Sequence, residues 1–384
     1  MHNERSKNVN PLKILHTESS WGWGGQEVRI LTESKALIVR GHEVCIAAPP
    51  DTPILREAQA LGIEAIGLPI RRKKIAGVLA IRKLVCNRHF DVINTHSSTD
   101  SWLTVLACQT VANAPRVVRT RHVSTPVRST AANRWLFGKA TARIVTTGEA
   151  VREMLIQDLG LDADRVVSIP TGVDSNLYKP VTKEQKKMLR EKRGIPNDKL
   201  VVGTVATLRF LKGIEYLFEA VRVLNNAHCV LYVVGDGPQR TRLESWIVEH
   251  GMESRIMMVG EQRNVHEWLQ SFDIFVFPSL SEGVPQALAQ AMLTELPCVT
   301  TNVGGIPELA IDQVTALVTK PRDPQALANA VNALISIPIR AESMGSAARL
   351  YCISAQSLET MARKMEIAFE KDLPIDRRQI NSTD

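Results

Sequence analysis

Paired cysteines and long apolar runs are both missing from this 384-residue chain. The six cysteines are scattered and form no Cys-x-x-Cys pair, so we expect neither a disulfide framework nor a cysteine metal site, but buried thiols in a reducing cytoplasm. No run reaches about 18 apolar residues, which predicts that no helix spans a membrane. The polar N-terminus lacks the apolar core of a signal peptide, so we expect none.

The composition is that of a folded protein with a basic first half. Apolar residues make up 44% of the chain and charged residues 23%, enough for two α/β domains with separate cores. Residues 1–180 carry 24 Lys and Arg against 16 Asp and Glu, whereas the remainder carries 23 against 24. The basic excess fits an anionic membrane surface or an anionic acceptor, or is a solvated surface. No nucleic-acid-binding motif is present, so we expect no nucleic-acid partner.

The clearest candidate site lies in residues 277–309. An apolar strand at 274–277 leads through a loop to a helix at 286–293, and a Gly304-Gly305 turn follows the next strand. Free amides at the helix N-terminus, beside Gly283, can bind an anion. The negative charge of Glu282, at the opening of this anion site, is unfavourable beside a phosphate unless Glu282 binds another part of the ligand, such as sugar hydroxyls. The pattern predicts a nucleotide-sugar site, and the alternative is an ordinary strand–loop–helix unit with a solvated glutamate.

Other candidate residues also follow predicted strands. Arg209 and Lys212 stand in a loop before a helix, where they can neutralise a leaving diphosphate or are simply solvated. Gly24 and Gly25 precede a helix and fit one side of a diphosphate, although a tight turn explains them equally well. His96 and His122 end two strands, where open α/β sheets bind ligands; structural histidines are the alternative.

Several motifs resemble the signature of the family 4 (group 1) glycosyltransferases, which are retaining enzymes of the GT-B fold. The matching motifs are Ile169-Pro170-Thr171-Gly172-Val173-Asp174, Gly235-Asp236-Gly237-Pro238, Glu282-Gly283-Val284-Pro285 and Val303-Gly304-Gly305-Ile306-Pro307-Glu308-Leu309. The resemblance extends over about residues 12–370. It implies two Rossmann-like domains facing a central cleft, at 1–180 on the acceptor side and 181–355 on the donor side. Residues 356–384 would form a helix that crosses back to the first domain and a polar tail.

The resemblance also implies roles for the candidate residues. Glu282 would hold the hydroxyls of the donor sugar. Arg209, Lys212 and the amides near Gly283 and Val284 would stabilise the departing diphosphate, with Gly24 and Gly25 facing the donor phosphates. His122 would lie close to the reacting sugar, and Arg263, Asn264 and Val265 would meet the base. No metal or other cofactor is implied besides the nucleotide-sugar co-substrate.

Two positions depart from the family pattern. In the family, seven residues separate two glutamates. The first is Glu282 here and the second position is Gln290, which would still accept a hydrogen bond from the ribose. Thr207 stands where the family usually has an arginine, and Arg209 is expected to substitute for it.

The implied function is that of a hexosyl- or heptosyltransferase of lipopolysaccharide or polysaccharide biosynthesis. Its acceptor would be a cell-envelope glycan or a lipid-linked molecule. We expect a cytoplasmic protein, with peripheral attachment to the inner face of the cytoplasmic membrane as a further expectation. The basic run at residues 71–74 is the candidate for contact with anionic lipid, and a solvated loop is the alternative. Two other functions remain open: a nucleotide-sugar epimerase or hydrolase on the same fold, and a non-catalytic nucleotide-sugar-binding protein.

Overall fold

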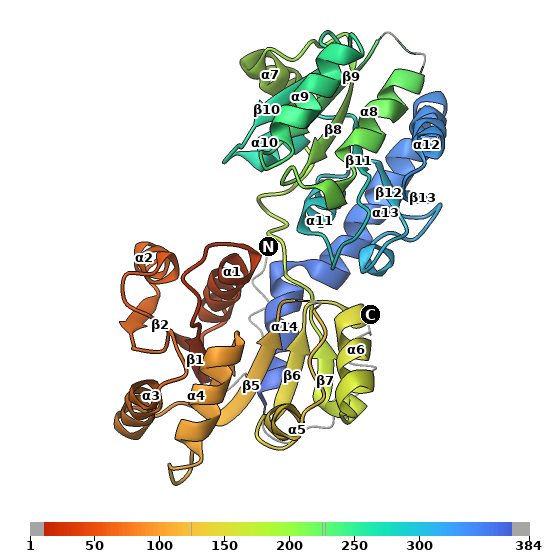
Figure 1. Ribbon diagram of the computed structural model, residues 1–384. Helices are drawn as coiled ribbons and strands as arrows, with labels where there is room; N and C mark the ends of the chain where they lie inside the picture. Colours follow the sequence, from red (N-terminus) through yellow and green to blue (C-terminus); the bar gives the residue numbers. More distant parts are fainter. Residues whose placement is uncertain (1–10, 124, 225, 227, 371–384) are drawn as a thin grey trace. The chain divides into compact units, whose positions relative to one another are not determined.

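The structure is a computed structural model that describes residues 11–123, 125–224, 226 and 228–370. The chain forms two compact units (Figure 1). The first unit contains the chain up to Gly172 and again from Leu358, and the second contains Val173–Ser357. The first division therefore falls before the expected boundary at residue 180, and the second falls two residues after the expected boundary at 355.

Within the described residues, the first unit is built on a seven-stranded parallel sheet in the order β3-β2-β1-β4-β5-β6-β7. The strands are β1 (Lys13–Thr17), β2 (Glu43–Ala48), β3 (Glu64–Gly67), β4 (Val92–Thr95), β5 (Arg116–Arg121), β6 (Arg143–Thr146) and β7 (Val166–Ser168). The helices are α1 (Gly25–Val39), α2 (Pro53–Ala60), α3 (Ile75–Asn87), α4 (Ser98–Cys108), α5 (Ala131–Gly138), α6 (Glu149–Leu159) and α14 (Leu358–Phe369).

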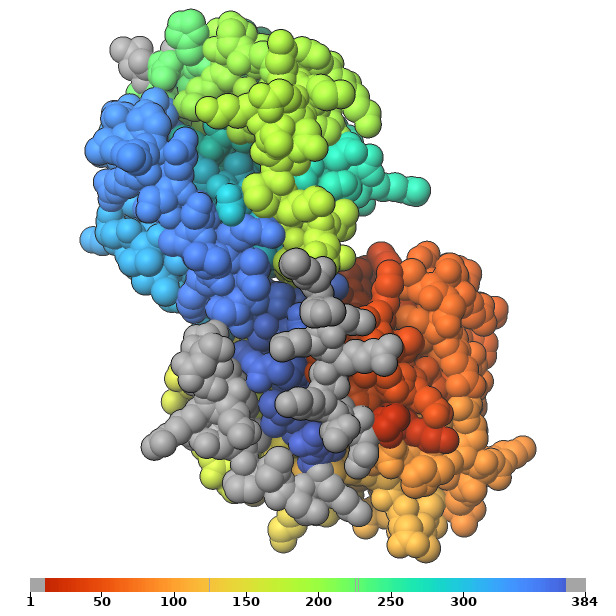
Figure 2. Space-filling view, turned by 180° about the vertical axis from the view of Figure 1, so that it is seen from behind, coloured from red at the N-terminus to blue at the C-terminus, as the bar shows by residue number. Residues whose placement is uncertain are grey.

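Helices cover both faces of this sheet, because successive side chains of a strand point to opposite sides. On β1, Ile14 packs in the core that contains α14, whereas Leu15 packs in the core formed with α3 and α4. The helix α14 lies beside α1, and Figure 2 shows its blue atoms next to the red N-terminal segment. The helix α14 thus completes the core of the first unit.

The part of the second unit that the structure describes contains a six-stranded parallel sheet in the order β10-β9-β8-β11-β12-β13. The strands are β8 (Leu200–Val205), β9 (Cys229–Val234), β10 (Ile256–Gly260), β11 (Ile274–Phe277), β12 (Cys298–Thr301) and β13 (Leu317–Thr319). The helices are α7 (Lys183–Arg193), α8 (Ile214–Val223), α9 (Arg240–Glu249), α10 (Val265–Leu269), α11 (Gln286–Leu293), α12 (Pro324–Ser336) and α13 (Pro338–Gln356).

The expected α/β class is confirmed, since both units are parallel sheets with helical layers. The helix α13 was not expected from the sequence, because its small and polar residues show no regular apolar stripe. The close packing of α13 against the backbone that follows α11 depends on Gly345, where an added Cβ would lie only 2.2 Å from the carbonyl oxygen of Glu295. The expectation of buried thiols is wrong for Cys86, which is exposed. Among the described helices, none has the length and apolar character needed to cross a bilayer.

Candidate functional site

Close contacts between glycines and backbone bring three loops together at the carboxyl edge of the second sheet. Gly213 has a φ of +65°, and an added Cβ would lie 2.1 Å from the carbonyl oxygen of Pro278. Gly304 has a φ of +55°, and its Cβ would lie 1.8 Å from the carbonyl oxygen of Glu282. Only glycine fits both positions. The loops after β8, β11 and β12 therefore meet where ligands bind in parallel α/β sheets.

Glu282 is held in this loop cluster by two partners. Lys212 Nζ forms an ion pair with Glu282 Oε1, and Ser279 Oγ donates a hydrogen bond to the same oxygen over 2.9 Å. The side chains of Glu282 and Lys212 are 11% and 24% exposed. Lys212 also lies over the ring of Phe277, with Nζ 5.5 Å from its centre. The loops after β8 and β11 thus hold a carboxylate and an ammonium group side by side.

The structure does not bring Arg209 to this pair. Its backbone begins the short turn at Phe210–Lys212, and its side chain is exposed. Among the described residues, the Arg209 side chain makes no hydrogen bond or ion pair. Thr207 is exposed in the same loop. Of the two cations predicted here, Lys212 contacts Glu282 and Arg209 remains in solvent.

The helix α11 starts beside this loop, as the sequence predicted. Gly283 is exposed, and an added Cβ would meet no atom within 4 Å, so the approach to the helix N-terminus is open on that side. Val284 is half-buried. Gln290 lies half-buried on the helix, and its side chain makes no hydrogen bond to the described residues. Its polar atoms are therefore available to a ligand.

The three residues expected to meet a nucleotide base follow β10 at the same edge of the sheet. Arg263 and Asn264 are exposed, and Val265 is the half-buried first residue of α10. The strand order places β10 at the end of the sheet, beyond β9 and β8. These residues surround the edge without contacting Glu282.

In the first unit, the glycine pair leaves open space. Gly24 is extended, with a φ of −171°, and Gly25 is the first residue of α1. An added Cβ on Gly25 would meet nothing within 4 Å, and one on Gly24 would only approach a carboxylate oxygen of Glu27 at 3.7 Å. Neither a left-handed turn nor tight packing requires glycine here. Within the described part of the first unit, no atom therefore crowds Gly25 at the start of α1.

Three histidines form a hydrogen-bonded row across the ends of β1, β4 and β5. His16 Nδ1 lies 2.9 Å from His96 Nε2, and His96 Nδ1 lies 2.9 Å from His122 Nε2. Burial lowers the pKa of all three, and that of His122 falls to about 3. The row is therefore neutral at physiological pH. Its nitrogens face one another, and the described residues contain no group of His, Cys, Asp and Glu arranged to hold a metal ion.

Sequence reasoning found His96 and His122 from their places at strand ends, but missed His16 and a buried acidic pair. Glu18, just after β1, accepts a hydrogen bond from the Ser20 amide over 2.7 Å and another from Gln26. Burial, and then the nearby Asp100, raise the pKa of Glu18 to about 8. Glu18 is therefore mostly protonated at neutral pH.

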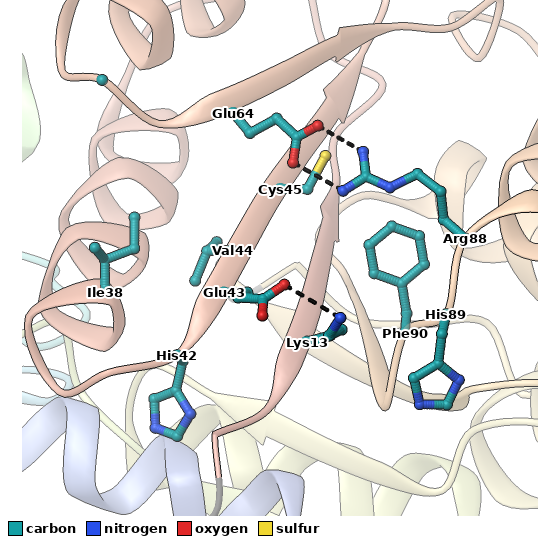
Figure 3. A pocket seen from close by; sticks show the side chains of 11 residues that line it. Lys13, Ile38, His42, Glu43, Val44, Cys45, Glu64, Arg88, His89 and Phe90 are labelled. Carbon is teal, nitrogen blue, oxygen red and sulfur yellow. Dashed lines mark hydrogen bonds and ion pairs between the residues drawn. The ribbon is translucent and has the colours of Figure 1, made fainter.

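One hollow of the first unit lies away from these strand ends. A cavity of about 510 Å³ opens beside the starting residues of β1 and β2 (Figure 3). Its charged groups pair with one another: Arg88 with Glu64 at 2.6 Å and Lys13 with Glu43 at 3.5 Å. Because parallel sheets bind ligands at the opposite edge, this cavity is not the candidate site.

Comparison with known proteins decides the family. Residues 23–177 match the family model described as Glycosyltransferase Family 4, and residues 185–351 match that described as Glycosyl transferases group 1. The chain is a group 1, family 4 glycosyltransferase. The two matches include every candidate residue of both units. The resemblance predicted from the loop motifs is confirmed.

The glycosyltransferase has relatives of known name and structure. It is 29% identical over 273 residues to UDP-Gal:alpha-D-GlcNAc-diphosphoundecaprenol alpha-1,3-galactosyltransferase of Escherichia coli, covering 67% of this chain and 70% of the relative. It is 25% identical to D-inositol 3-phosphate glycosyltransferase of Xylanimonas cellulosilytica, covering 85% and 87%. Its fold is similar to that of Anabaena HepE, solved with UDP, with a TM-score of 0.77, 22% identity and coverage of 92% and 98%. The two parallel-sheet, Rossmann-like units are those of the GT-B fold.

Proposed function

We propose that this glycosyltransferase moves a hexosyl or heptosyl group from a nucleotide sugar to a cell-envelope glycan or lipid-linked acceptor, with retention of anomeric configuration. The observation that carries the proposal is the contact of Glu282 with Lys212 and Ser279 beside the open N-terminus of α11. The complex of HepE with UDP and the UDP-galactose donor of the E. coli relative support a nucleotide-sugar donor. That relative's diphosphoundecaprenol acceptor supports a role in lipopolysaccharide or polysaccharide biosynthesis.

Donor binding would rearrange the Lys212–Glu282 pair. The β-phosphate would take Lys212 and the free amides at the start of α11 as its partners, because an anion is favoured at a helix N-terminus. Glu282, still held by Ser279, would then accept hydrogen bonds from the donor sugar. Arg209, free in solvent, would swing onto the diphosphate. These two cations would supply the charge that a metal supplies in other transferases, so the proposed reaction needs no metal.

The remaining candidate residues would orient the two substrates. Gln290 would accept a hydrogen bond from the ribose, and residues 263–265 would contact the base. In the first unit, Gly24 and Gly25 would let a phosphate approach closely. His122 would present a neutral imidazole to the reacting sugar, with its ring orientation fixed by His96.

We further propose that the first unit attaches peripherally to the anionic inner face of the cytoplasmic membrane. Residues 71–74 are exposed and strongly basic, and α3 follows them directly. On α3, Ile75 is 73% exposed and Leu79 is 56% exposed, one turn apart. A basic run beside exposed apolar side chains suits a lipid headgroup boundary.

The test begins with a thermal-shift screen of UDP-, GDP- and ADP-sugars, since a bound donor raises the melting temperature. Transfer is then measured with the stabilising donor, and NMR of the product reports the anomeric configuration. Glu282→Ala should lower kcat by about 10²–10³, because its contacts strengthen in the transition state, while binding of the free nucleotide diphosphate stays near that of the wild type. EDTA should leave the rate unchanged.

The exposed Glu253→Ala, in the same unit, is the matched control. An unchanged kcat in Glu282→Ala would remove this residue from the mechanism. Release of free sugar without an acceptor would instead favour a hydrolase. Donor binding without any turnover would favour a non-catalytic binding protein.

A further inference from the structure

A buried arginine on β5 has no counterion in the part of the chain that the structure describes. Arg119 is only 4% exposed, and its Nε and Nη1 atoms have no hydrogen-bond partner. Its guanidinium lies 4.1 Å from the centre of the Phe137 ring. A buried cation without a hydrogen-bonded partner is strongly unfavourable, and an aromatic face compensates only part of that penalty. The charge of Arg119 therefore lacks the hydrogen-bonded anion that would balance it.

Two more cations accompany Arg119. Arg121 lies two residues further along the strand and so on the same face of the sheet. It is 8% exposed, donates to the Thr125 carbonyl through Nη2, and leaves its own Nε without a partner. Lys73 reaches Ser98 Oγ at 3.4 Å, at the start of α4. Burial, and then the charge of Arg119, lower the pKa of Lys73, which indicates that the two cations are close.

The nearby acids do not neutralise this cluster. Asp100 already accepts hydrogen bonds from Thr17 Oγ1 at 3.0 Å and from the amide of His96 at 2.9 Å. It attracts Arg119 without a hydrogen bond or ion pair between them. Glu18 is mostly neutral at pH 7, because its pKa is raised to about 8. Three cations thus face at most one carboxylate, which leaves a net positive charge at the carboxyl edge of the first sheet.

We propose that Lys73, Arg119 and Arg121 form a subsite for a phosphate or diphosphate group of the acceptor. The proposal rests on the transferase function proposed above and names the chemistry of its acceptor. Guanidinium groups bind phosphate through paired, charge-assisted hydrogen bonds. Beside the subsite, the centre of the Trp102 ring lies 5.6 Å from Lys73 Nζ. The Trp102 ring stacks on that of Trp135, with 6.0 Å between the ring centres. This aromatic wall suits the sugar or lipid to which the phosphate is attached.

The test measures pyrophosphate binding to the full-length protein by calorimetry. Lys73→Gln changes an exposed side chain, and Arg119→Lys keeps the buried charge but loses the paired donors, so both variants should fold. Each should weaken binding of inorganic pyrophosphate by about tenfold, the loss of one charge-assisted hydrogen bond. Lys212→Gln should leave this site intact and affect only binding at the donor site. The exposed Arg82→Gln on α3 is the matched control and should bind as the wild type does.

Kinetics then separate the two sources of the phosphate. With a soluble glycosyl phosphate and with a prenyl-diphosphate sugar in vesicles, both subsite variants should raise the acceptor KM and leave the donor KM unchanged. Whichever acceptor shows the larger effect identifies the source. A phosphate-free acceptor that the wild type uses equally well would overturn the proposal, as would unchanged pyrophosphate binding in both folded variants. If no sugar is transferred at all, the proposed function fails while the calorimetric result still stands.

Discussion

The buried carboxyl of Glu18 predicts how the stability of the first unit depends on pH. The pKa of this group rises from an ordinary value of 4.5 to about 8, first because of burial and then because of Asp100. Its hydrogen bonds from Ser20 and Gln26 oppose the rise without cancelling it. No cation contacts the carboxyl among the described residues. We therefore expect Glu18 to stabilise the fold only while it carries a proton.

The direction and size of the effect follow from proton linkage. Between pH 4.5 and about 8 the folded state holds a proton that the unfolded state has released, so the free energy of unfolding falls as pH rises. The stabilisation is complete below pH 4.5 and is lost through pH 8. Each pH unit inside this window costs up to about 1.4 kcal/mol. From pH 6 to pH 8 the loss is about 2 kcal/mol, because the slope flattens as the folded pKa is reached.

Glu18→Gln should remove this dependence. A glutamine has the shape of the protonated carboxyl, and its carbonyl can still accept the Ser20 amide. In urea unfolding followed by tryptophan fluorescence, the variant should match the wild type near pH 6 and exceed it by about 2 kcal/mol at pH 8. The exposed Glu57→Gln on α2 is the control and should follow the wild type. If the free energy of unfolding falls equally in Glu18→Gln and in the wild type between pH 6 and pH 8, the reasoning is refuted.

Two further predictions concern the donor site and the membrane. Gln290→Ala should raise the donor KM by about tenfold with little change in kcat, because ribose contacts change little in the transition state. Gln290→Glu should keep most of the activity. If only Gln290→Glu transfers sugar and the wild type does not, the natural site is inactive. Replacing residues 71–74 with acidic residues should weaken sedimentation with anionic liposomes at low salt, since each basic side chain near a leaflet contributes about 1 kcal/mol. Equal sedimentation of both proteins would contradict attachment through this run, and no sedimentation of the wild type at low salt would contradict membrane attachment.

The site in the second unit could be predicted from the sequence because its residues are close in the chain or follow strands. Glu282 lies in the loop that connects a predicted strand to a predicted helix, and Lys212 precedes another helix. Parallel strands bring such loops to one edge of a sheet. The contact between Lys212 and Glu282 joins loops 70 residues apart. The chain pattern predicted both loops but not which of the two cations, Arg209 or Lys212, would reach the carboxylate.

The first unit was harder to predict, because burial there depends on distant segments. Glu18 follows a strand in a run of polar residues, which is typical of a solvated loop. Its raised pKa comes from burial and from Asp100, far along the chain. His16 is the last residue predicted for the first strand, and only the order β1-β4-β5 places it beside His96. Arg119 directly follows two buried valines on β5, and the sequence does not show that its guanidinium lacks a counterion.

The two units use their cations differently, and this determines how each would respond to an anion. Lys212 already has Glu282 as a partner, so a phosphate at Lys212 would have to displace that carboxylate. In the proposed function, phosphate binding would therefore be coupled to the release of Glu282 towards the donor sugar. Arg119 has no such partner among the described residues, so an incoming phosphate would displace no protein group and would give Nε and Nη1 the hydrogen-bond acceptors that they lack. The first arrangement favours exchange of ligands during a reaction. The second favours retention of one anionic group, which is the requirement for holding an acceptor while its hydroxyl reacts.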